Sequence, residues 1–179
     1  DSPLRGSPFS ASLCFKENLV AVWQVPVELV PRPWTEEHGT STVALYDEDG
    51  FHDTSCAWKG NQPTQNLEDV FGKILPKSTS SDDEVSLWGS DKKHDISAWY
   101  EDGSVVSIGI RIDMRESLNE LPSQLVNAAQ KLNCQFFITG QQKIIEPNIF
   151  ELKTYLLKSN AAKFVNNPIE FLKGVDNEQ

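Results

Sequence analysis

Residues 95–115 read DISAWYEDGSVVSIGIRIDMR, and this stretch decides the expected fold. Two runs rich in β-branched and aromatic residues flank Glu101-Asp102-Gly103, a sequence typical of a tight hairpin turn. In the longer run every second position is apolar: Val106, Ile108, Ile110, Ile112 and Met114. This period of two indicates a strand with one face against a core. The stretch therefore predicts two antiparallel strands, at 95–100 and 104–114.

Further elements are predicted on both sides of this hairpin from their apolar spacing. Toward the C-terminus we expect, in order, a helix at 122–133, strands at 134–139 and 143–146, and helices at 148–157 and 160–165. Toward the N-terminus we expect strands at 10–15, 19–30, 40–46 and 51–58, followed by a short helix at 66–75. This order predicts an α+β fold with a mainly antiparallel sheet and with helices concentrated in the C-terminal half.

A chain of 179 residues is long enough to bury one substantial core. We expect a flexible lead-in at 1–9, a single α+β domain at 10–175 and a frayed tail at 176–179. The polar run at 77–84 is the best linker candidate, so two lobes joined there are an alternative. Because Pro26 cannot donate a backbone hydrogen bond, the strand at 19–30 is expected at a sheet edge or to end in a bulge.

The charge balance narrows the class of partner. Acidic residues outnumber basic ones by 26 to 16, which gives a net charge of −10. This balance disfavours nucleic acid and anionic membranes, because binding to either depends on clustered Lys and Arg. No apolar run in the sequence approaches the roughly 20 residues that span a bilayer. The three cysteines, an odd and widely spaced set, favour free thiols in a reducing cytoplasm, with a single disulfide as the alternative.

The sequence offers little for metal binding or catalysis. His52 and Cys56 come nearest to a zinc pair, yet four residues along a strand would separate them by about 13 Å. Asp47 and Asp49 precede Gly50 as in a calcium loop, but the spacing of the remaining ligands does not fit. We therefore expect no cofactor, no metal and no catalysis. A small hydrolase using Cys56 and His52 is the alternative, and it predicts that Cys56→Ala abolishes turnover.

Polar residues on one strand and in acidic turns are the candidates for binding a partner. Arg111, Asp113 and Arg115 alternate along the predicted strand, so they project from one face. They can form a cross-strand ion-pair ladder, or they can offer a partner's carboxylate the planar contacts of an arginine. Trp99, beside the turn, is a candidate interface anchor. The turns and the linker add Asp47, Glu48, Asp49, Asp82, Asp83 and Glu84.

Two runs carry a resemblance to a known class of proteins. They are WYEDGSVVSIGIRIDMR at 99–115 and SNAAKFVNNPIEFL at 159–172. Together with the acidic charge, they resemble small bacterial immunity-type proteins of polymorphic or contact-dependent toxin systems. The resemblance covers roughly residues 85–175 and implies an inhibitor that binds and occludes a toxin domain without catalysis. The acidic charge of the chain would suit a basic toxin domain. Monomer or homodimer is left open by the sequence, and a subunit that self-associates through the strand at 19–30 is a further alternative.

Overall fold

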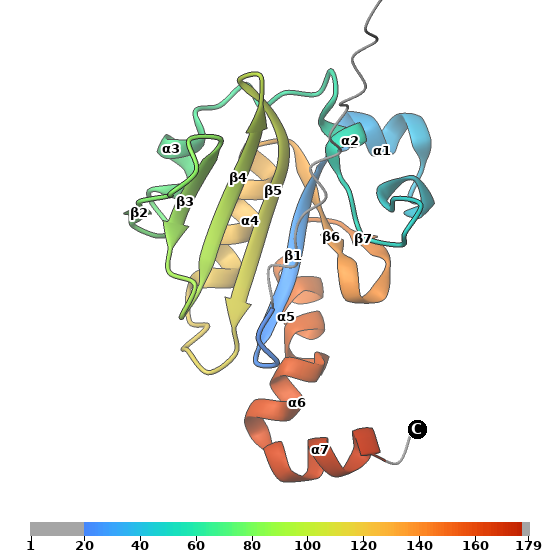
Figure 1. The fold of residues 1–179 in the computed structure, drawn as a ribbon, viewed down its shortest axis with the longest axis vertical. Coiled ribbons are helices and arrows are strands. Elements are labelled where there is room, and N and C mark those ends of the chain that lie inside the picture. Colours follow the sequence, from blue (N-terminus) through green and yellow to red (C-terminus); the bar gives the residue numbers. More distant parts are fainter. Residues whose placement is uncertain (1–19, 177–179) are drawn as a thin grey trace, which may run out of the picture.

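A seven-stranded antiparallel sheet forms the centre of the molecule in the computed structural model, which describes residues 20–176 (Figure 1). The strands are β1 Gln24–Pro31, β2 Lys77–Ser78, β3 Val85–Gly89, β4 Asp95–Glu101, β5 Ser104–Asp113, β6 Cys134–Ile138 and β7 Lys143–Ile145. Their order across the sheet is β2-β3-β4-β5-β1-β6-β7. The longer helices follow β5 in the chain, so the predicted α+β class and the C-terminal concentration of helices are confirmed.

The β4–β5 hairpin matches its prediction. Asp102 and Gly103 form the turn with φ values of 49° and 76°, the left-handed conformation that a two-residue hairpin turn requires. The register shifts between Trp99 and Tyr100, because Trp99 pairs with Ser107 whereas Tyr100 pairs with Val105. This bulge buries Val105, while the expected core residue Val106 is only half-buried.

β1 lies inside the sheet, so the prediction of an edge strand at 19–30 was wrong. Its first half pairs with β5 and its second half pairs with β6, with Glu28 opposite both Gly109 and Phe137. Pro26 pairs with Arg111 at a point that the β6 ladder has not yet reached. A residue without an N–H is tolerated there because β1 has one neighbour at that position. The strand expected at 10–15 lies outside the described residues.

The segment between β1 and β2 was predicted least well. The expected strands at 40–46 and 51–58 are instead the 3₁₀ helix η1 Val43–Leu45 and the helix α2 Ser55–Trp58. One isolated bridge, between Tyr46 and His52, is all that the structure has of the expected hairpin. The turn between them is confirmed, because Asp47 accepts the N–H groups of Asp49 and Phe51 on its carboxylate.

Two further differences concern short elements. The helix expected at 66–75 is shorter, α3 Leu67–Phe71, and is capped by the side chain of Asn66. The linker expected at 77–84 carries β2, which pairs with β3 at the sheet edge. β3 itself was not predicted from the sequence. The strands on both sides of this segment therefore belong to one sheet.

Three of the remaining helices match the predicted positions within a few residues: α4 Leu121–Lys131, α5 Ile149–Lys158 and α6 Asn160–Asn166. Two further helices, α1 Arg32–His38 and α7 Pro168–Asp176, were not expected. A second 3₁₀ turn, η2 Thr139–Gln141, joins β6 to β7. Within the described part of the chain, no helix has both the length and the apolar character needed to cross a bilayer.

The sheet buries apolar residues on both faces. Val25, Val27 and Leu29 of β1 point to one face, where they share a core with Leu125 and Ala129 of α4. Figure 1 shows α4 crossing behind β4 and β5. On the opposite face lies a smaller cluster consisting of Val30, Trp34, Leu45, Ala57, Phe137 and Ile144. This second cluster fixes the segment from α1 to α2 on the sheet and so positions Asp47 and His52.

Candidate functional site

Five exposed carboxylates gather where β3 begins and β4 turns into β5. We call this surface the acidic end; its members are Asp82, Asp83, Glu84, Glu101 and Asp102. The backbone N–H of Tyr100 donates to the carbonyl of Glu84 at 2.8 Å, and Val85 pairs with Trp99. Both turns lie at the same end of the sheet in Figure 1. Glu101 and Asp102 had not been singled out in the sequence, because only strand pairing brings them beside the predicted acids.

The loop that carries the first three acids has a defined conformation. The N–H of Asp82 donates to Ser80 Oγ at 3.0 Å, and the N–H of Glu84 donates to Asp82 Oδ1 at 2.9 Å. The N–H of Val85 donates to the carbonyl of Asp82 at 3.2 Å, which leads the chain into β3. Among residues 20–176, none of the five carboxylates forms an ion pair. The charges are thus held close together without neutralisation by a base.

A polar hollow of about 480 Å³ adjoins the acidic end, between α3 and the strands β3 to β5. Gly103 and Ser104 line it from the turn, and Tyr100 lines it from β4. Gln62 closes the β5 side, since its amide accepts from the N–H of Val105 at 2.7 Å and donates to the carbonyl of Val105 at 2.9 Å. The hollow is large enough to receive a side chain from a partner.

The one basic side chain that lines this hollow is already engaged. Lys77 Nζ lies 3.1 Å from Glu68 Oε2 and 4.2 Å from the ring centre of Trp88. Trp88 donates its Nε1–H to the same Glu68 oxygen at 3.1 Å. Lys77 therefore neutralises Glu68 rather than the acidic end.

The other predicted acidic turn lies far from this surface. Asp47, Glu48 and Asp49 follow η1, and the adjacent Tyr46 donates its hydroxyl to the carbonyl of Thr139 at 3.1 Å. Thr139 directly follows β6, which is four strand positions from β3, or about 19 Å across the sheet. The structure therefore does not bring the two predicted acidic groups together.

The row Arg111, Asp113 and Arg115 forms ion pairs within the fold. Arg111 pairs with Asp95, its cross-strand neighbour, and Arg115 Nη2 lies 2.6 Å from Asp113 Oδ2. Asp113 is fully buried, so its carboxylate is out of reach of a partner. This geometry corresponds to the ion-pair alternative. Trp99 is half-buried on β4 beside Val85, one residue from the acidic end.

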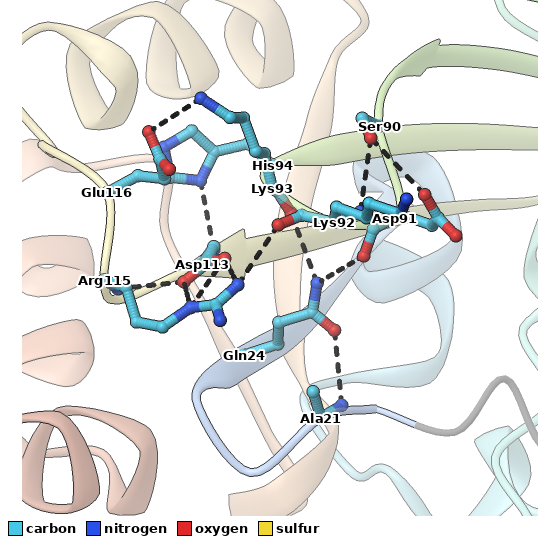
Figure 2. A network of polar contacts seen from close by, with 10 residues as sticks. All are labelled: Ala21, Gln24, Ser90, Asp91, Lys92, Lys93, His94, Asp113, Arg115 and Glu116. Atoms are coloured by element: carbon cyan, nitrogen blue, oxygen red, sulfur yellow. Dashed lines mark hydrogen bonds and ion pairs between the residues drawn. The ribbon is translucent and has the colours of Figure 1, made fainter.

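A network around Asp113 fastens the opposite end of the sheet, as Figure 2 shows. Arg115 stacks on Trp23 at 4.2 Å and donates to the carbonyl of Lys92 at 3.1 Å. The N–H of Asp113 donates to His94 Nδ1 at 3.0 Å, so His94 carries its proton on Nε2. Gln24 donates to the carbonyls of Asp91 and Lys93. These contacts join the start of β1, the β3–β4 loop and the end of β5.

The structure also places a histidine–carboxylate pair that the sequence did not reveal. His52 Nε2 lies 2.8 Å from Glu28 Oε1, and Thr54 donates its hydroxyl to Glu28 Oε2 at 2.7 Å. The hydrogen bond with Glu28 raises the pKa of His52 above its ordinary value, although burial opposes this. Both residues line a small hollow of about 140 Å³, together with Arg111.

The two cysteines in the described part of the chain have raised thiol pKa values, whereas an activated nucleophile needs a lowered one. Cys56 Sγ donates to the carbonyl of Ala44 at 3.3 Å, and burial raises the pKa of this thiol. Burial also raises the pKa of Cys134 to about 12. His52, the base of the hydrolase alternative, is engaged with Glu28. Within the described residues Cys56 and Cys134 are free, and no cluster of His, Cys, Asp and Glu could hold a metal ion.

Comparison with known proteins adds no relative. No protein-family model matches the sequence. No curated protein and no solved structure matches it either. Function therefore has to follow from the charge and geometry of the chain itself.

Proposed function

We propose that this chain is a noncatalytic binding protein which holds a basic partner protein on its acidic end. The observation that carries the proposal is the convergence of five exposed carboxylates, none of them in an ion pair, at one end of the sheet. In the particular form that we favour, the chain is a cytoplasmic immunity-type protein and the partner is a toxin domain that it occludes. The run at 99–115, which resembles immunity-type proteins, includes Glu101 and Asp102.

The electrostatics of the acidic end suit fast, salt-sensitive binding. Five like charges within a small area create a field that attracts a basic surface and accelerates encounter. The net charge of −10 adds to this field at long range. Because the acids are exposed, each contact with a partner gives little free energy, and added salt should weaken the complex.

The polar hollow beside the acidic end supplies the depth that a flat charged surface lacks. Hot spots of protein interfaces are side chains that insert into a pocket, and Arg is prominent among them. An arginine that entered past Gly103 would meet the hydroxyl of Tyr100 and the polar side chains of the lining. A toxin held there by an essential basic residue would be inhibited by occlusion alone.

A pull-down from a lysate of the source cell, at low and at high salt, tests the proposal. The bait is the full chain, and bound proteins are identified by mass spectrometry. A variant of the acidic end, D83N/E84Q/E101Q/D102N, should lose the captured basic protein and its salt dependence. Asp82 is left intact because its carboxylate holds the loop. Expression of the captured protein alone should be toxic, and co-expression with the chain should relieve the toxicity.

A matched control distinguishes the effect of the charges at the acidic end from the effect of the net charge of the chain. The variant E36Q/E37Q/E48Q/D49N removes the same number of charges from exposed positions on α1 and the 47–49 turn. It should retain the partner almost fully. Equal loss in both variants would mean that only net charge matters, which contradicts a specific acidic end. A captured protein that is basic but harmless would support the binding surface and refute the immunity role.

A further inference from the structure

The last helix of the described chain projects from the molecule. α7 turns away from the sheet and lies beside α6, as Figure 1 shows at the lower end. Phe164 of α6 and Phe171 of α7 pack edge to face, with ring centres 5.8 Å apart. A nine-residue helix has little stability of its own in water, so it depends on packing.

α7 exposes two large apolar side chains one turn apart. Ile169 is 69% exposed and Leu172 is 54% exposed. A second exposed apolar pair lies on α5, where Phe150 is 76% and Leu157 is 67% exposed. Residues seven apart lie on the same face of a helix, so Phe150 and Leu157 form one stripe. Within one copy, these fractions show that neither pair covers the other.

We propose that two copies of this chain form a dimer by exchanging α7. In each copy the Ile169–Leu172 face of α7 packs on the Phe150–Leu157 stripe of the other copy's α5. A two-fold axis repeats this contact, so the dimer buries the α7 face and the α5 stripe of both copies. The face on α7 and the stripe on α5 are also of similar size, two large side chains each.

The area fits a dimer of moderate affinity. Burial of about 100 Å² for each of these side chains gives roughly 400 Å² of apolar area per copy, or roughly 800 Å² in the dimer. Apolar atoms make up about 60% of an ordinary interface, so the total would be about 1,300 Å². This value lies at the lower end of stable, specific interfaces, which begin near 1,200 Å².

Charge favours a second copy over a lipid surface. Helices that lie on anionic membranes are rich in Lys and Arg on their polar face. The polar residues of α7 are Glu170, Lys173 and Asp176, which leave it with a net negative charge. The acidic end lies at the opposite end of the molecule in Figure 1, so dimerisation would leave both acidic surfaces available.

Sedimentation equilibrium of the full chain over a range of micromolar concentrations tests the exchange. The wild type should show a concentration-dependent dimer. I169E/L172E and F150E/L157E should each raise the dimer dissociation constant by about 100-fold or more. Glu170→Lys on α7 and Glu151→Lys on α5 are the matched controls, since they reverse a charge on the same helices at exposed positions away from the apolar faces, and they should still dimerise.

Mixing the two double variants distinguishes exchange from other dimers. In a heterodimer the intact α7 of one variant meets the intact α5 of the other, so one of the two contacts is restored. The mixture should therefore contain dimers, whereas each variant alone should stay monomeric. A wild type that stays monomeric throughout would overturn the proposal. A wild type that dimerises, together with double variants that do not associate on mixing, would also overturn the proposal. That result would favour α7 packing on α7. A monomer that binds vesicles containing phosphatidylserine would assign the apolar faces to a membrane instead.

Discussion

Arg111 Nε lies 3.0 and 2.9 Å from the two carboxylate oxygens of Asp95, the residue directly opposite it on β4. The Asp95 side chain is 5% exposed and that of Arg111 is 22% exposed. Burial raises the pKa of Asp95, and Arg111 opposes this rise. The pair therefore fixes the β4–β5 register, because a shift by one residue would leave a buried carboxylate without its cation.

Removal of Arg111 should destabilise the fold more than removal of the pair. Arg111→Met leaves Asp95 buried and unpaired, so the free energy of unfolding should fall by about 3 kcal/mol. The double variant R111M/D95N should regain at least about 1 kcal/mol relative to the sum of the single variants. Urea unfolding of the four proteins measures this coupling. Additive losses would show that the two side chains contribute independently.

His52 should increase the free energy of unfolding as the pH falls from 8 to 6. Its folded pKa lies above the ordinary value of 6.5, because of Glu28. A raised histidine pKa means that the stabilisation is complete below 6.5 and is lost as the pH rises through the folded value. Relative to His52→Gln, the wild type should therefore gain stability between pH 8 and pH 6. Urea midpoints across this range provide the measurement, and parallel profiles for the two proteins would contradict it.

His94 should have the opposite effect, in a pH window that lies below 6.5. Burial lowers its pKa below 6.5, and its Nδ1 accepts the N–H of Asp113, a bond that protonation would remove. The stabilisation is present above 6.5 and is lost as the pH falls through the folded value. The variant His94→Gln should lose this acid sensitivity. Nitrogen NMR of the imidazole should show the proton on Nε2 at neutral pH, and a proton on Nδ1 would refute the assignment.

Gly89 and Gly103 both have a positive φ, but they should differ in how well they tolerate a side chain. Gly89 has a φ of 87°, and a Cβ there would lie 2.2 Å from the carbonyl oxygen of His94. Gly103 has a φ of 76°, with nothing within 4 Å of a Cβ. Gly103→Ala should cost about 1 kcal/mol from backbone strain, whereas Gly89→Ala should cost about 3 kcal/mol or more. Thermal unfolding of both variants gives the comparison, and equal losses would show that the contact at Gly89 relaxes freely.

The fold was predictable where local chemistry and periodicity agreed. Asp102-Gly103 specified its turn, and the alternating isoleucines of β5 specified its buried face. In the segment at 40–46 the alternation was short, and a 3₁₀ turn satisfies it equally well. η1 exposes Val43 by 80% and buries Leu45 completely. Sequence periodicity cannot distinguish a short strand from a 3₁₀ turn when tertiary packing, rather than pairing with another strand, holds the segment in place.

The candidate site was predictable only in part. The acids at 82–84 were found from composition, but their neighbours Glu101 and Asp102 join them through the β3–β4 pairing, and β3 had not been predicted. Glu28 and His52 lie on segments that meet only after the chain folds, so no local spacing marks them. Such neighbours can be identified only once the pairing of the strands is known.

The position of β1 has a consequence for how the chain is made. β1 is the earliest strand of the sheet to be synthesised, yet its neighbours are β5, which ends at Asp113, and β6, which ends at Ile138. During translation β1 therefore waits for most of the chain before either flank is covered, and contacts of such long sequence separation form slowly. Its apolar residues stay available to chaperones or to aggregation throughout that interval. Completion of β6 is therefore the point in synthesis at which the second flank of β1 can first be covered.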